Sequence, residues 1–89
     1  MLSGKQKEVL HVLHQLMDTN EREIEDILYQ LQNNPSFFSK TIWTWNAYVL
    51  GGVLSNLIKK NIISFEDVCG DTYFFIKITK EKVEQLLYS

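Results

Sequence analysis

The stretch that decides the fold is TWNAYVLGGVLSNLIKKNII, residues 44–63. Its apolar side chains recur at helical spacing, which places four of them on one helix face: Leu50, Val53, Leu54 and Leu57. Thr44 is a suitable N-cap residue, and Asn61 suits the left-handed position that follows a helix. The stretch therefore predicts an amphipathic helix over residues 45–60 whose apolar face is turned to a core.

The flanking segments predict two earlier helices, a β-hairpin and a short last helix. The expected ranges are 4–16 and 20–32 for the earlier helices, 62–65 and 72–78 for the strands, and 80–87 for the last helix. A capping box at Ser3 and Gln6 supports the first helix, and turn residues 66–71, around Gly70, join the strands. The path of residues 33–43 stays open. The predicted fold class is α+β, mainly α, in a single domain over residues 1–89.

Length and composition describe one small domain with an uneven charge distribution. The 89 residues are 45% hydrophobic, which is enough for one core, and the net charge is −2. Residues 18–32 carry −4, from five carboxylates and one arginine, whereas residues 33–60 carry +3 from lysines alone. The chain is thus acidic overall, with one basic segment that contains the predicted helix 45–60.

The sequence favours a reducing, cytoplasmic location. Cys69 is the only cysteine, so no disulfide can form within the chain and no cysteine-rich zinc site is expected. The longest uncharged run, residues 41–58, is too polar for a membrane span, and the first residues lack the apolar core of a signal peptide. We therefore expect a cytoplasmic protein that has no contact with a membrane.

No combination of residues indicates an enzyme, a cofactor or a metal site. His11 and His14 lie three apart on a predicted helix, but no third metal ligand accompanies them. The acidic run that includes Glu23 and Glu25 lacks the glycine spacing of a calcium loop. Cys69, in an acidic turn, fits a surface position better than a nucleophile. The chain is therefore expected to be a binding protein.

The order of the predicted elements, together with residues 44–63, resembles the small winged helix-turn-helix regulators of bacteria and phages. In those proteins one helical turn of small residues comes before two leucines three positions apart. Two basic residues, a glycine or asparagine, an apolar residue and an isoleucine then follow. Residues 51–63 are similar to that pattern. Residues 18–31 resemble the first helix of their helix-turn-helix. The resemblance implies that helix 45–60 enters the DNA major groove and that the hairpin is the wing.

Two features depart from that family. The connection over residues 33–43 is much longer than the usual short turn between the two helices. The predicted wing, residues 66–71, carries three acids and no cation, whereas wings of the family often carry basic residues for phosphate. The resemblance therefore implies phosphate contacts from helix 45–60 and its neighbours rather than from the wing.

The candidate binding residues are the side chains opposite the apolar face of helix 45–60, with a few neighbours. Ser55 and Asn56 can hydrogen-bond base edges, Trp45 and Tyr48 can contact thymine methyl groups or the backbone, and the lysines can contact phosphates. The complete set is Lys40, Thr44, Trp45, Asn46, Tyr48, Gly52, Ser55, Asn56, Lys59, Lys60 and Lys77. The leading hypothesis is a transcriptional regulator that binds duplex DNA.

Four features each allow two interpretations. The same aromatic face fits a protein partner, as in an adaptor, an inhibitor or a dimerisation module. Trp45 and Tyr48 either point outward or fold back into the core. Gly51 and Gly52 weaken the helix, so they serve either close packing against another helix or close approach of a partner. The apolar side of helix 80–87 either closes the core or forms the seam of a homodimer.

Overall fold

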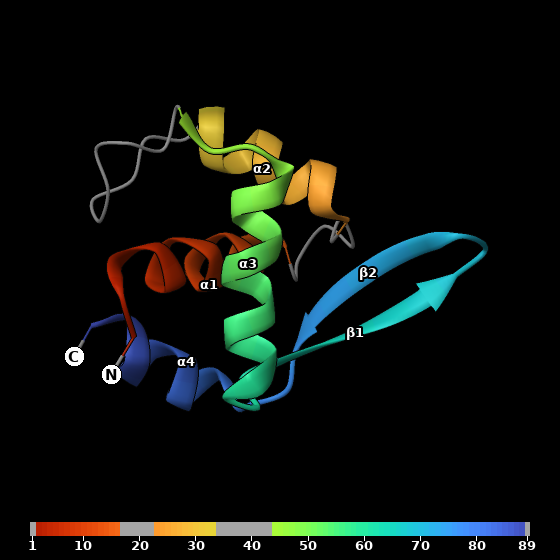
Figure 1. Cartoon of the computed structure of the whole chain (residues 1–89). Coiled ribbons are helices and arrows are strands. Elements are labelled where there is room, and N and C mark those ends of the chain that lie inside the picture. The colour runs from red at the N-terminus through yellow and green to blue at the C-terminus, as the bar shows by residue number, and fades with distance from the viewer. Residues whose placement is uncertain (1, 17–22, 34–43, 89) are drawn as a thin grey trace.

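The computed structural model describes residues 2–16, 23–33 and 44–88. Three helices, an antiparallel two-stranded hairpin and a short last helix follow one another along the chain (Figure 1). Their bounds are Gly4–Leu16 for α1, Ile24–Asn33 for α2, Ala47–Lys59 for α3, Ile63–Val68 for β1, Asp71–Ile76 for β2 and Lys80–Leu87 for α4. The predicted α+β, mainly helical class is confirmed.

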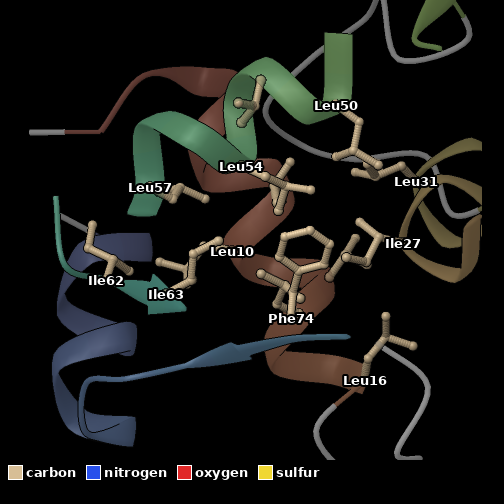
Figure 2. Close-up of a cluster of buried hydrophobic side chains, with 14 of the residues drawn as sticks. Leu10, Leu16, Ile27, Leu31, Leu50, Leu54, Leu57, Ile62, Ile63 and Phe74 are labelled. Carbon is tan, nitrogen blue, oxygen red and sulfur yellow. The ribbon is translucent and has the colours of Figure 1, made fainter. Parts of the chain in front are cut away.

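Helix α1 lies at the centre of the molecule and packs against α2, α3, α4 and β2. Its ends match the predicted range, and the Ser3 hydroxyl accepts a 3.2 Å hydrogen bond from the Gln6 N–H while the Gln6 side chain accepts one of 2.9 Å from the Ser3 N–H. Figure 2 shows Leu10 of α1 among side chains of the other elements, including Ile27, Leu54 and Phe74. One apolar core therefore joins the helices to the base of the hairpin.

Helix α3 presents the predicted apolar face to this core, since Leu50, Val53, Leu54 and Leu57 are all buried. The helix begins later than predicted, because Asn46 rather than Thr44 is the N-cap and its side chain accepts a 2.9 Å hydrogen bond from the Val49 N–H. At the other end Asn61 has a positive φ of 60°, as predicted. The N–H groups of Asn61 and Ile62 donate to the carbonyls of Ile58 and Leu57, which is a Schellman motif that directs the chain into β1.

The first strand is longer and the turn tighter than the sequence predicted, whereas the second strand, Asp71–Ile76, ends two residues before the predicted end at residue 78. Strand β1 runs to Val68, so most of the expected turn 66–71 is strand, and only Cys69 and Gly70 connect β1 to β2. Both have positive φ, 54° and 88°, as a type I′ turn requires. Phe65 pairs with Phe74, and Phe74 is buried in the core. The hairpin therefore extends well beyond the helices (Figure 1).

Helices α2 and α4 differ in how well their ends were predicted. The expected range 20–32 for α2 becomes Ile24–Asn33, and residues 20–22 of that range lie outside the described residues. Asn33 is the last residue of α2, and its side chain donates a 2.8 Å hydrogen bond to the Tyr29 carbonyl. Helix α4 has its predicted range, Thr79 is its N-cap, and it buries Val83 and Leu87. Val83 and Leu87 of α4 therefore close the core. No helix in the described ranges has the length and apolar character needed to cross a membrane.

Candidate nucleic-acid interface

The exposed side of α3 forms one continuous stripe. Five residues spaced four, three, one and three positions apart are all exposed, and we call them the α3 stripe: Tyr48, Gly52, Ser55, Asn56 and Lys59. They lie opposite the buried leucines, because these spacings return to the same side of an α-helix. Helix α3 crosses in front of α1 in Figure 1. Because all five residues are exposed, the stripe is open to a partner in the part of the chain that the structure describes.

Trp45, which the helical wheel placed on the outward side, is 97% buried, with only 3% of its surface exposed. The wheel fails there because Trp45 precedes the helix: the chain at Asn46 is extended, with φ −125° and ψ 177°. The Lys5 ammonium lies 5.5 Å from the Trp45 ring centroid, and the Gln32 side chain donates a 3.1 Å hydrogen bond to the Trp45 carbonyl. Trp45 therefore belongs to the core and not to the binding surface.

Tyr48 has the opposite environment, since 90% of its surface is exposed. Of the two interpretations of these aromatic residues, the outward one holds for Tyr48 alone. Asn46 is exposed but its side-chain oxygen is occupied as the N-cap of α3. Thr44 is also exposed and precedes the helix. The candidate surface on α3 thus narrows to the α3 stripe, in which Tyr48 is the only aromatic residue.

The predicted cations gather at the C-terminal end of α3. Lys59 is exposed at the end of the stripe, and Lys60 is the C-cap. The Lys60 ammonium donates a 3.0 Å hydrogen bond to the Gln6 side chain, so it also links α3 to α1. The Lys77 N–H donates a 2.9 Å hydrogen bond to the Ile62 carbonyl, which places exposed Lys77 beside the same end. Lys40 lies outside the described residues.

The paired glycines have open space around them. A Cβ atom built on either Gly51 or Gly52 meets no atom of a neighbouring element within 4 Å. The interpretation that the two glycines let another helix pack closely on α3 is therefore wrong for the described part of the chain. Gly52 is exposed in the stripe and Gly51 is half-buried beside it.

Acidic groups surround the other end of the molecule. Glu66, Asp67 and Asp71 are exposed near the tip of the hairpin, and Asp67 accepts a 2.7 Å hydrogen bond from the Thr72 hydroxyl. A side-chain hydrogen bond to Glu23, followed by the negative charge of the same carboxylate, raises the pKa of the nearby Tyr73 phenol. The three candidate lysines at the end of α3 are thus separated along the surface from the three acids at the tip of the hairpin.

The described residues contain no group of three His, Cys, Asp or Glu side chains that could hold a metal ion. His14 is half-buried, and its Nδ1 has no hydrogen-bond partner in the described part of the chain. Glu8 is almost fully buried, and its Oε1 is also unpartnered there. Cys69 is a free thiol exposed in the hairpin turn. None of these groups joins the α3 stripe in a shared site.

The arrangement of three helices, a hairpin and a C-terminal helix is compatible with a winged-helix-like topology. An isolated bridge between Glu23 and Tyr73 adds a third segment to the outer edge of β2 and ties the start of α2 to the hairpin. No protein-family model, curated protein or solved structure matches this chain.

Proposed function

We propose that this protein is a winged-helix regulator that binds duplex DNA through the α3 stripe. The observation that carries the proposal is the stripe itself. It is an exposed helix face with small and polar side chains, on a helix that is followed at once by a hairpin and that ends in lysines. A helix of this kind fits the major groove, which admits one α-helix and displays hydrogen-bonding base edges.

Each residue of the stripe has a role that its chemistry supports. Asn56 can make two hydrogen bonds to an adenine edge, and Ser55 can bond to several bases. Tyr48 offers an apolar ring for a thymine methyl group and a hydroxyl for a phosphate. Gly52 has no side chain, so the helix backbone can approach the DNA closely at that point.

Phosphate contacts would come from the end of α3, where Lys59, Lys60 and Lys77 lie near one another. Three neutralised phosphates per copy correspond to a slope of about −3 in log affinity against log salt concentration, at about 0.9 per contact. The acids of the hairpin disfavour DNA at the tip, so the proposed orientation turns the hairpin tip away from the phosphates. Binding would therefore be weak for one copy and strongly dependent on salt.

Fluorescence anisotropy with a labelled duplex of random sequence, at several salt concentrations, tests this proposal. We expect Lys59→Glu to lower the affinity and to reduce the salt slope by about one or more. Lys82→Glu, an equal change of charge at an exposed position of α4, is the matched control and should change the affinity much less. If no complex forms at low salt, or if both variants lose affinity equally, DNA binding through the stripe is refuted.

A protein partner on the same stripe is the second candidate, and the 90% exposure of Tyr48 favours it. Exposed tyrosines are common anchors in protein interfaces, and only one residue of the stripe is charged. Tyr48→Ala should then abolish partner capture by the immobilised protein, while Tyr29→Ala, at another exposed tyrosine, should retain it. If Lys59→Glu loses DNA binding while Tyr48→Ala still captures the partner, the stripe binds DNA and not the protein partner.

A homodimer would double the number of lysines that face one DNA duplex. Because α4 uses Val83 and Leu87 in its own core, a dimer seam on α4 would rest on the exposed ring of Tyr88 and its neighbours. We propose this dimer as the DNA-binding form. Thermal denaturation at several protein concentrations tests it, since the midpoint of a dimer rises with concentration and that of a monomer does not.

A further inference from the structure

The outer edge of β1 lies open in the part of the chain that the structure describes. The sheet contains only β1 and β2, so each strand has one edge that faces away from its partner. The outer edge of β2 is bridged by Glu23, and β2 also packs against α1 and α2. Strand β1 lies on the side of the hairpin that is turned away from α2 (Figure 1). An additional strand therefore has access to β1 and not to β2.

The hydrogen-bond pattern identifies the backbone groups on this edge. The Lys77 N–H donates to the Ile62 carbonyl, so residues 62 and 77 form a hydrogen-bonded pair. Hydrogen-bonded and non-hydrogen-bonded pairs alternate along an antiparallel ladder. With the register of the hairpin, Ser64, Glu66 and Val68 then bond to β2. The N–H and carbonyl groups of Phe65 and Asp67 point outward, where a further strand would pair with them.

Natural edge strands are protected by charged side chains, especially lysines, or by prolines, bulges or covering elements. Among the residues that the structure describes, β1 has one of these features, the carboxylates of Glu66 and Asp67. Strand β1 contains no lysine and no proline, and its register with β2 runs without a bulge. Half of the surface of Phe65 and 44% of that of Val68 are exposed. The centroids of the Phe65 and Phe74 rings lie 6.5 Å apart. A partner side chain on the same face of the sheet would therefore have an apolar neighbour.

Charge identifies the chemistry of the strand that fits. Glu66 and Asp67 are both exposed on β1, and the sequence has no cation from residue 61 to residue 76. Two copies of β1 paired antiparallel would bring four carboxylates close together, which disfavours a second copy of this chain. Neighbouring strands share faces, so an apolar partner side chain would lie beside Phe65 and a cationic one beside Glu66.

We propose that β1 binds an extended segment of a partner protein in which cationic and apolar residues alternate, and that this segment adds a strand to the hairpin. Main-chain hydrogen bonds to Phe65 and Asp67 supply the pairing, and side chains supply the selectivity, as in other strand-addition complexes. This surface is separate from the α3 stripe, so the proposal does not depend on DNA binding. It gives the acidic hairpin a role that phosphate binding cannot explain.

Amide hydrogen exchange measured by NMR tests the proposal, with a blocked heptapeptide of alternating lysine and valine as the probe. In the protein alone, the Phe65 and Asp67 amides should exchange faster than those of Ser64 and Glu66, which bond to β2. The peptide should slow exchange at Phe65 and Asp67 and leave the α3 stripe unchanged. A heptapeptide of glutamate and valine should not bind, and methylation of alternate peptide amides, on the edge that pairs with β1, should abolish binding.

Two variants with the same change of charge test whether the charge of β1 itself determines peptide binding. Glu66→Lys should weaken peptide binding about tenfold, because it places like charges opposite each other. Glu81→Lys makes the same change of charge on α4. Because Glu81 is exposed and remote from the edge of β1, this variant should keep its peptide affinity within about twofold. The proposal is overturned if the methylated peptide binds equally, if protection appears on α3 instead, or if both variants bind alike. Protection of Phe65 and Asp67 that rises with protein concentration without peptide would also overturn it, because the occupant is then a second copy.

Discussion

Replacing Gly52 with alanine should make the protein more stable and, at the same time, poorer at binding DNA. Glycine inside a helix is about 1 kcal/mol less favourable than alanine. The added Cβ at this position meets no neighbouring atom within 4 Å, so no clash offsets that gain. We therefore expect Gly52→Ala to raise the free energy of unfolding by about 0.4–1 kcal/mol, which corresponds to a higher midpoint by roughly 2–8 °C in a domain of this size.

The effect on binding has the opposite sign because Gly52 lies in the middle of the α3 stripe. A methyl group there would hold the helix backbone away from a DNA surface that approaches closely. Gly51→Ala is the matched control, since that position is equally open but lies beside the stripe. Thermal denaturation followed by circular dichroism, together with anisotropy on duplex DNA, measures both effects. A lower midpoint in either variant would refute the description of α3, and equal affinity in the two variants would refute the role of Gly52.

The other predictions concern the fold. Asn46→Ala should cost about 1 kcal/mol of stability, because it removes the N-cap of α3, and chemical denaturation measures the loss. Leu10→Ala should cost about 2–5 kcal/mol, since this fully buried side chain lies where α1 meets the rest of the core; a smaller loss would show a looser core. Glu23→Gln should lower the pKa of Tyr73 toward its usual value of 10.0, as followed by NMR titration. Because the folded pKa is raised, the Tyr73–Glu23 contact stabilises the fold fully below pH 10 and is lost as the pH rises through the folded pKa.

The sequence predicts best those features that repeat or that have a single local cause. The buried face of α3 follows from four residues at helical spacing, and all four are in the core. The end of α3 follows from Asn61, one of the few residue types that adopt a positive φ readily. The ends of α4 follow in the same way from Thr79 and a short apolar pattern. In each case residues close together in the sequence determine the feature, so residues distant in sequence have little effect on it.

The sequence predicts less well those features that depend on tertiary contacts. Trp45 is buried because the chain before α3 is extended, which a helical wheel cannot represent. The acids at residues 66 and 67 suggest a turn, yet they lie in β1, because the two-residue turn at Cys69 and Gly70 extends the ladder to its very end. Lys60 contacts Gln6 across 54 positions of sequence, which no local pattern contains. The open edge of β1 is recognisable only once this register is known.

The separation of charge gives the two proposed surfaces different partners. Lysines at the end of α3 would attract phosphates and the acids of the hairpin would repel them, so DNA would be directed to the helix and away from the tip. The same acids would attract a cationic strand, and the lysines at the end of α3 would repel that strand. The bridge between Glu23 and Tyr73 ties the middle of the hairpin to the residue before α2, so both surfaces belong to one folded unit. A protein built in this way could hold DNA on one side and a second protein on the other, with neither competing for the site of the other.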